Sequence, residues 1–286
     1  MSVTEGFNDP SVMVLTALIK VKKAMKKLRI IGSGMKGIHH LTQEAIKNMT
    51  ETKKILWLGD MEGLAELIAQ RNLEGEEITS LYENGALDFD NYSKIKNKVI
   101  SELDQFNDVA LVVLGHPRLG VSIVQEFQES ANEGNFDLQV LPGISSFDTM
   151  INDLNIDPIE EGSCLVDANR LILYNYQMDP CLNYLIYHVC SIGNSNTDYK
   201  SPQINNAVTF LKNKLLAHFS PDHKITLVSS GSSVNMTAKV FKNSIINLEL
   251  LLKNVSFDSS LFIPAIIPKA KQINREFYNY IINQVS

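Results

Sequence analysis

The fold is decided by the stretch Val109-Ala110-Leu111-Val112-Val113-Leu114-Gly115-His116-Pro117. Its first six side chains are all apolar, which is typical of a central strand buried on both faces of a parallel sheet. Gly115, His116 and Pro117 then end the run, because glycine and proline interrupt regular strand pairing. We therefore expect a central parallel strand whose carboxyl end borders a ligand crevice.

Strand and helix patterns alternate on both sides of this run. Before it, residues 28–31 and 54–58 are expected to be strands, each followed by a turn and a helical pattern, and residues 93–103 an amphipathic helix after a turn-rich segment. After it, a helix over roughly 121–133 precedes a strand around 138–140. This βαβα order predicts a mainly parallel sheet covered by helices.

The pattern changes after Leu141-Pro142-Gly143. A helix is expected over 145–154, followed by segments that look like antiparallel strands at 163–166, 171–176, 182–189, 224–229 and 261–264. We expect two α/β domains, residues 28–143 and 144–286. Residues 1–27 form an extension, with an added amphipathic helix over 10–27.

Composition narrows the class of function. The 286 residues carry a formal charge of −6, with 44% apolar and 20% charged residues, as in ordinary globular proteins. The negative charge leaves no excess of cations for a nucleic-acid backbone. Three cysteines without a CxxC pair indicate a reduced, metal-free cytoplasmic protein. The apolar segment 12–21 precedes its lysines, which is the reverse of a signal peptide, and is too short to span a bilayer. We expect no membrane partner.

A glycine loop follows the first expected strand. Gly32-x-Gly34-x-x-Gly37 leads toward a helix, and Asp60 lies at the end of the next strand, where a Rossmann fold places its ribose-binding acid. Taken alone, the loop indicates an NAD-dependent dehydrogenase, which we keep as an alternative. It is equally consistent with a tight strand-to-helix turn.

Several short segments occur in an order that resembles a known family. With the loop at Gly32, the strand-end segments Gly115-His116-Pro117 and Leu141-Pro142-Gly143-Ile144-Ser145-Ser146 resemble the tetrapyrrole methylase superfamily. Over residues 28–270 the chain is most similar to the borosin peptide α-N-methyltransferases, through Tyr82-Glu83-Asn84-Gly85 with Tyr92, Asn155-Ile156-Asp157-Pro158, Pro221-Asp222-His223 and Phe262-Ile263-Pro264. The resemblance implies two α/β domains with S-adenosylmethionine in the cleft between them.

The cofactor residues implied by this resemblance lie mainly at strand ends. A methyl donor needs a concave site that backbone can approach closely, which Gly115 and Gly143 permit, while Pro117 and Pro142 stiffen their loops. The expected cofactor-binding residues are Gly32, Gly34, Gly115, His116, Pro117, Val121, Ser122, Gly143, Ile144, Ser145 and His188.

A second group of residues would carry out the chemistry of amide methylation. An amide nitrogen is a poor nucleophile because its lone pair is delocalised, so the site needs a base near the nitrogen and a donor near the oxygen. The resemblance assigns these tasks to Tyr82, Tyr92 and an arginine, but Asp88 occupies the arginine's position. Arg118 or Lys94 could supply the cation. Alternatively, the substrate could be more acidic than a peptide amide, Asp88 could itself be a base, or the site could bind the cofactor without efficient turnover. We take Tyr82, Tyr92, Asp88 and Arg118 as the candidate catalytic residues and favour a participating Asp88.

The expected function is therefore methylation of backbone amides in a ribosomally synthesised precursor peptide. Only about twenty residues follow Phe262-Ile263-Pro264, with no core-peptide tail, so we expect the peptide to be a separate chain and the enzyme to be a homodimer. A small-molecule methyltransferase acting on a tetrapyrrole or another metabolite, a weak cofactor-binding module and the NAD-dependent dehydrogenase are the alternatives.

Overall fold

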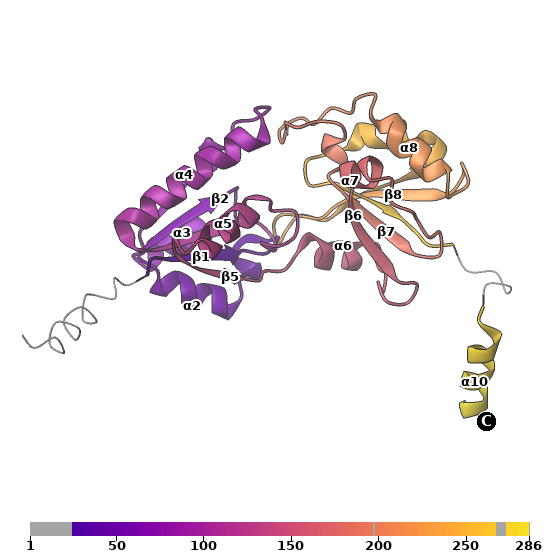
Figure 1. The fold of residues 1–286 in the computed structure, drawn as a ribbon, viewed down its shortest axis with the longest axis horizontal. Helices are drawn as coiled ribbons and strands as arrows, with labels where there is room; N and C mark the ends of the chain where they lie inside the picture. The colour runs from indigo at the N-terminus through magenta and orange to yellow at the C-terminus, as the bar shows by residue number, and fades with distance from the viewer. Residues whose placement is uncertain (1–24, 197, 267–272, 286) are drawn as a thin grey trace, which may run out of the picture.

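A computed structural model describes residues 25–196, 198–266 and 273–285. Residues 25–266 form two halves side by side, each built around its own sheet, and the helix near the carboxyl terminus is drawn apart from both (Figure 1). The helix expected over 10–27 lies outside the described residues except at its end. There, Met25 and Lys26 are not helical, and Lys27 begins the first strand. Among the helices of the described ranges, none is both long and apolar enough to cross a bilayer.

The first sheet is parallel throughout. Its strands are β1 (Lys27–Gly32), β2 (Lys54–Leu58), β3 (Gly75–Glu77), β4 (Asp108–Val113) and β5 (Asp137–Leu141), in the order β3-β2-β4-β1-β5. The expected central position of the 109–114 run is confirmed, because β4 pairs with both β1 and β2.

Helices cover both faces of this sheet, which explains the unbroken apolar run. Val109, Leu111 and Val113 face α4 (Asp88–Phe106) and α5 (Ile123–Asn132). Ala110 and Val112 face α2 (Gln43–Glu51) and α3 (Leu64–Gln70). Successive side chains of a strand point to opposite faces, so both sets must be apolar.

The second sheet is mixed. Its strands are β6 (Ser163–Asp167), β7 (Asn183–Tyr187), β8 (Lys224–Ser229), β9 (Lys239–Ser244) and β10 (Ser260–Ile263). Their order is β6-β7-β10-β8-β9, and only the β6–β7 pair is parallel. One face packs against α7, α8 and α9, and the other against α6. The chain passes from the first sheet to the second between β5 and α6, and we keep residue 143 as the proposed domain boundary. The α-helices that follow this boundary are α6 (Ser146–Leu154), α7 (Ala168–Leu173), α8 (Val208–Leu216), α9 (Leu248–Leu251) and α10 (Arg275–Val285).

Two expected elements are wrong in type or extent. In the segment 171–176, where a strand is expected, residues 171–173 end the helix α7 and residues 174–175 form a turn. The first turn of α7 is capped by the Asp167 side chain, which accepts the backbone N–H of Arg170. The helix expected over 93–103 begins at Asp88, where acidic residues in the first turn favour the positive end of the helix dipole. Asp88 and Tyr92 therefore belong to α4 rather than to a turn.

Candidate functional site

Three strand-end loops meet at Gly32, Gly115 and Gly143, which we call the glycine junction. They follow the neighbouring strands β1, β4 and β5, whose carboxyl ends share one edge of the sheet. A Cβ atom on Gly32 would lie 2.5 Å from the Gly115 carbonyl oxygen and 2.7 Å from the Gly143 nitrogen. A Cβ on Gly143 would lie 2.4 Å from the same carbonyl oxygen. The loops thus touch backbone to backbone, which only glycine allows.

A pair of hydrogen bonds joins two of these loops. The Gly34 N–H donates to the Gly115 carbonyl oxygen at 3.3 Å, and the Gly115 N–H donates to the Gly34 oxygen at 3.0 Å. The loop after β1 does not open an α-helix, because α2 begins only at Gln43, with Thr42 as its cap. A Rossmann pyrophosphate site needs a helix amino terminus directly after this loop. The dinucleotide interpretation of the glycine motif is therefore wrong.

Several other expected cofactor residues belong to the loops that carry the junction glycines. His116 Nδ1 accepts the Arg118 backbone N–H at 3.0 Å, which fixes the turn through the buried Pro117. Ser145 caps α6, and its hydroxyl and N–H both donate to Asp148. Large apolar side chains are exposed immediately after β4 and near the end of β5, where Leu114 is 37% and Ile144 36% exposed.

Tyr82, Asp88 and Tyr92 form a compact group that we call the tyrosine–aspartate cluster. The Tyr82 hydroxyl donates to Asp88 Oδ1 at 2.7 Å, and the two tyrosine rings lie 6.0 Å apart between centroids. Burial and the negative charge of Asp88 raise the pKa of Tyr92, although hydrogen bonds with Tyr82 and Ser122 oppose the shift. Ser122 belongs to the segment that follows β4 and Val121, so it connects the cluster to the loop of Gly115.

The two cations suggested as replacements for the family's arginine have other partners. The exposed Arg118 donates from its guanidinium to Gln128 Oε1 on α5 at 2.8 Å. The Lys94 ammonium pairs with Glu83 Oε2 at 2.9 Å. Neither contact stabilises a negative charge between the two tyrosines.

The second half contributes residues that the sequence did not indicate. The ring of Tyr199 lies 5.9 Å from that of Tyr82 in an edge-on arrangement, and the Asp88 backbone N–H donates to the Ser195 carbonyl oxygen at 3.2 Å. Burial raises the pKa of the Cys190 thiol to about 11, with a contribution from Asp88, so this thiol stays protonated. No sequence motif marks Tyr199, which comes from an irregular loop.

His188 reaches the first half from just beyond β7. It lies outside the strand in which we placed it and adopts a positive φ of 58°. Its Nδ1 pairs with Asp167 Oδ2 at 2.7 Å, and a Cβ on Gly120 would lie 3.3 Å from its Nε2. Burial alone would raise the pKa of Asp167, but hydrogen bonds from His188 and the Arg170 backbone lower it below its ordinary value.

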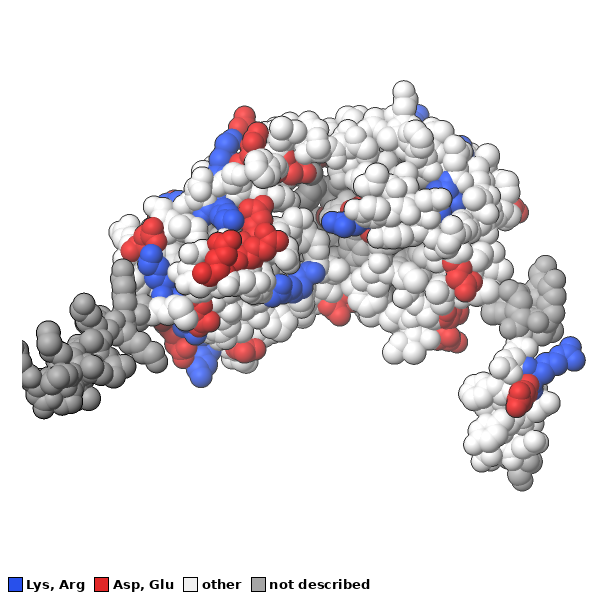
Figure 2. Space-filling model, in the orientation of Figure 1, with Lys and Arg blue, Asp and Glu red and all other residues white. Residues whose placement is uncertain are grey.

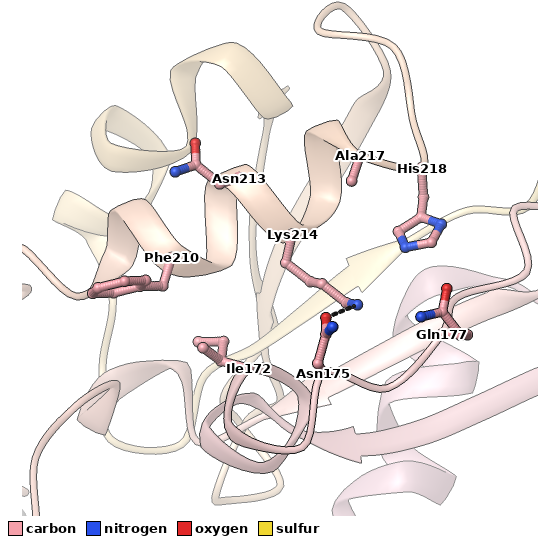
Figure 3. Close-up of a pocket in the computed structure, with 8 residues that line it drawn as sticks. All are labelled: Ile172, Asn175, Gln177, Phe210, Asn213, Lys214, Ala217 and His218. Atoms are coloured by element: carbon pink, nitrogen blue, oxygen red, sulfur yellow. Dashed lines mark hydrogen bonds between the residues drawn. The ribbon is translucent and has the colours of Figure 1, made fainter.

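The surface is hollowed between the two halves (Figure 2), and the ring contact of Tyr82 with Tyr199 joins the two halves. A separate open depression of about 460 Å³ lies between α7 and α8 (Figure 3). There, the Lys214 ammonium points across to Asn175 and donates to its Oδ1 at 2.8 Å. A further cavity of about 340 Å³ lies beside Phe136. Neither is lined by an expected site residue.

The chain is similar to known methyltransferases in sequence and in fold. The family of tetrapyrrole (corrin/porphyrin) methylases matches residues 27–171. Two solved structures share the fold. Uroporphyrin-III-C-methyltransferase from Thermus thermophilus has a TM-score of 0.58 and 15% identity, covering 85% of this chain and 96% of that one. The cobalamin biosynthetic enzyme cobalt precorrin-4 methyltransferase has a TM-score of 0.57 and 12% identity, covering 83% and 94%.

Curated relatives come from fungi. A methyltransferase/ribosomally synthesised type I borosin cyclic peptide precursor from Mycena rosella is 28% identical, covering 87% of this chain and 64% of the relative. A type II precursor of the same description from Phlebiopsis gigantea is 25% identical, covering 83% of this chain and 42% of the relative. The chain therefore spans about half the length of these relatives.

Proposed function

This chain belongs to the tetrapyrrole (corrin/porphyrin) methylase family, and we propose that it transfers methyl groups from S-adenosylmethionine to backbone amide nitrogens of a peptide. The similarity to borosin cyclic peptide precursors supports the peptide acceptor. The observation that carries the proposal is the tyrosine–aspartate cluster beside the glycine junction, with Ser122 connecting the two.

The glycine junction fits the methyl donor that this family uses. Backbone contact between the three loops keeps side chains out of their meeting point, and Leu114 and Ile144 offer apolar surface to an adenosyl group. When bound, S-adenosylmethionine supplies a methyl group activated by a sulfonium centre. The residues that would hold it are Gly32, Gly34, Gly115, His116, Pro117, Val121, Ser122, Gly143, Ile144, Ser145 and His188.

In the proposed reaction, Asp88 accepts a proton and Tyr92 donates a hydrogen bond. Asp88, held by the Tyr82 hydroxyl, accepts the proton that the amide nitrogen must lose. Tyr92 keeps its proton at neutral pH because its pKa is raised, so it donates a hydrogen bond to the amide oxygen as negative charge develops there. Arg118 and Lys94 are hydrogen-bonded to other residues, which supports a role for Asp88 itself in the reaction.

The peptide is proposed to be a separate chain and the enzyme a cytoplasmic homodimer. The curated relatives are named as methyltransferase and precursor together, so a separate substrate would be a departure from them. Large apolar side chains exposed along α10, including Phe277 at 61% and Tyr280 at 62%, support association with a second copy. Light scattering after size exclusion measures the dimer directly.

Two measurements test the function. Isothermal titration should show binding of S-adenosylmethionine and of S-adenosylhomocysteine but not of NAD. Co-expression with a candidate precursor peptide should give a product whose mass rises in steps of one CH₂, with fragmentation placing each step on a backbone nitrogen. Cofactor binding with methylation of a small metabolite, or with no methylated product, would overturn the peptide assignment.

A further inference from the structure

The side chain of Asn84, in a turn of the first half, makes three hydrogen bonds to a loop of the second half. Asn84 Oδ1 accepts the backbone N–H groups of Tyr199 at 2.9 Å and Lys200 at 3.2 Å. Its Nδ2 donates to Asp198 Oδ1 at 2.9 Å. One short side chain from the Tyr82–Gly85 segment thus holds three consecutive residues of the opposite half.

Hydrogen bonds within the turn of residues 198–201 hold it in the shape that contacts Asn84. Asp198 Oδ1 accepts the N–H groups of Ser201 at 2.9 Å and Lys200 at 3.0 Å. The backbone hydrogen bond from Ser201 and the side-chain bond from Asn84 lower the pKa of Asp198, so it is a carboxylate that requires a donor. An amide side chain supplies both the donor and the acceptor that this turn needs.

Neighbouring contacts reinforce the same connection. Asn196 Nδ2 donates to the Gly85 carbonyl oxygen at 3.1 Å, and Leu87 forms an isolated antiparallel bridge with Asn196. A separate bond across the halves is the Val234 N–H to Glu62 Oε2, at 3.1 Å. The Asn84 side of the cleft is therefore connected by several bonds in one place.

The connection ends on the candidate catalytic group. Holding the turn places the Tyr199 ring against Tyr82, and Phe257 supports Tyr199 from behind with centroids 6.4 Å apart. Tyr82 in turn donates to Asp88. Asn84 is thus connected to Asp88 by successive contacts, first with Tyr199, then between the rings of Tyr199 and Tyr82, and finally from the Tyr82 hydroxyl to Asp88.

We propose that Asn84 is a positioning residue that locks the 198–201 turn over the tyrosine–aspartate cluster, so that Tyr199 forms one wall of the acceptor site. The inference rests on the proposed function for its acceptor. Asn84 acts on acceptor binding and turnover through Tyr199, and it does not contribute to cofactor affinity, because its contacts are with the 198–201 turn rather than the glycine junction.

The test exchanges donor and acceptor across the contact. Asn84→Asp retains an acceptor for the two N–H groups but faces the Asp198 carboxylate with a second one. The variant Asn84→Asp/Asp198→Asn restores one donor and one carboxylate in exchanged positions. Asn135→Asp is the matched control, because Asn135 makes its hydrogen bonds within the first half, to Ser130 and Glu133.

Hydrogen exchange and cofactor titration need no acceptor. In Asn84→Asp, repulsion between the two carboxylates should separate residue 84 from the 198–201 turn, so that the Tyr199 and Lys200 amides also lose their acceptor. Their exchange should then accelerate about tenfold or more, since each lost hydrogen bond is worth roughly a factor of 2–10. Affinity for S-adenosylhomocysteine should stay within about twofold. The double variant should recover slow exchange, and Asn135→Asp should not change it.

Turnover of the peptide methylated by the wild-type enzyme completes the test. Asn84→Asp should raise its KM or lower kcat by about tenfold, and the exchanged pair should recover most of the loss. The proposal is overturned if amide exchange is unchanged, if cofactor affinity falls as much as turnover, or if the turn loosens without any kinetic effect. Absence of a methylated peptide with wild-type enzyme would instead refute the proposed function, and the exchange measurement would still decide whether the lock exists.

Discussion

The glycine junction and the tyrosine–aspartate cluster lie next to each other, but backbone atoms form the first and side chains form the second. The junction is backbone on backbone, contributed by three adjacent strands of one sheet. The cluster consists of side chains from a turn and a helix, and the second half completes it with Tyr199. The first region depends on excluded volume, and the second depends on charge and hydrogen bonding.

This difference predicts that the two regions fail separately. A change of size at the junction should remove cofactor binding whatever its charge. A change of charge in the cluster should remove chemistry while leaving the cofactor site intact. The four predictions below test that separation, beginning with the largest effect.

The largest effect is expected from Asp88→Asn. Asparagine can still accept a hydrogen bond from Tyr82 but cannot accept a proton, so kcat should fall by about 10²–10⁴, while affinity for S-adenosylhomocysteine stays within about twofold. Steady-state kinetics and calorimetry measure the two quantities. Higher turnover in both Asp88→Asn and Asp88→Arg would instead identify Asp88 as an inhibitory charge.

Gly143→Ala should cause the next largest loss, this time in cofactor binding. The added Cβ would lie 2.4 Å from the Gly115 carbonyl oxygen, and overpacking of this kind costs about 1–3 kcal/mol, equivalent to roughly 5- to 150-fold in affinity. Calorimetry with S-adenosylhomocysteine measures it. Gly134→Ala is the control, because its Cβ would have no atom within 4 Å, and there only the strain of a positive φ is expected. Equal affinities for the two variants would contradict the role of close backbone contact.

The third prediction concerns the raised pKa of Tyr92, which tests the tyrosine–aspartate cluster and not the glycine junction. The raised pKa of Tyr92 means that the folded state favours the protonated phenol, so the stability it contributes is present below its ordinary pKa of 10.0 and is lost as pH rises through the folded value. Burial also raises the pKa of Tyr184 and Tyr187, so the Tyr92 signal is obtained as the difference between the ultraviolet titrations of the wild-type enzyme and Tyr92→Phe. This difference should form above pH 10. In Asp88→Asn the same signal should move to lower pH, because the Asp88 charge is one cause of the shift. A Tyr92 signal below pH 10 in the wild-type enzyme would remove its assignment as a donor.

The smallest effect is expected at the contact between His188 and Asp167. Because the pKa of Asp167 is lowered, its contribution to stability is present above its ordinary value of 3.8 and is lost as pH falls through the folded value. Asp167→Asn should lower the melting temperature by about 2–4 °C at pH 7 and by less at pH 3. Asp60→Asn, an exposed carboxylate at the end of β2, should change neither. A difference that persists at pH 3 would indicate an effect on the cap of α7 rather than loss of the contact between the Asp167 carboxylate and His188.

The sequence predicted what depends on neighbours along the chain. The apolar runs of β1 and β4, and the glycines and prolines that end strands, are local signals, so the strand ends at the junction could be anticipated. The 171–176 segment could not be resolved, since a short apolar run fits either a strand or a helix, and its cap at Asp167 decides the outcome. Tyr199 was missed because its role depends on Asn84, more than a hundred residues away, rather than on any pattern around it.

The strand order of the first sheet also has a consequence for how the protein folds. Lys27, at the start of β1, pairs with Asp108 on β4 and with Asp137 on β5, so both neighbours of β1 are synthesised long after it. Loop-closure entropy must be overcome before such distant pairings stabilise the chain, which makes high-contact-order parallel sheets slow to form. During synthesis, β1 and the loop of the proposed cofactor site therefore have no strand partner until β4 emerges, and the second partner of β1 arrives only with β5. Unpaired strand edges of this kind expose a nascent chain to aggregation.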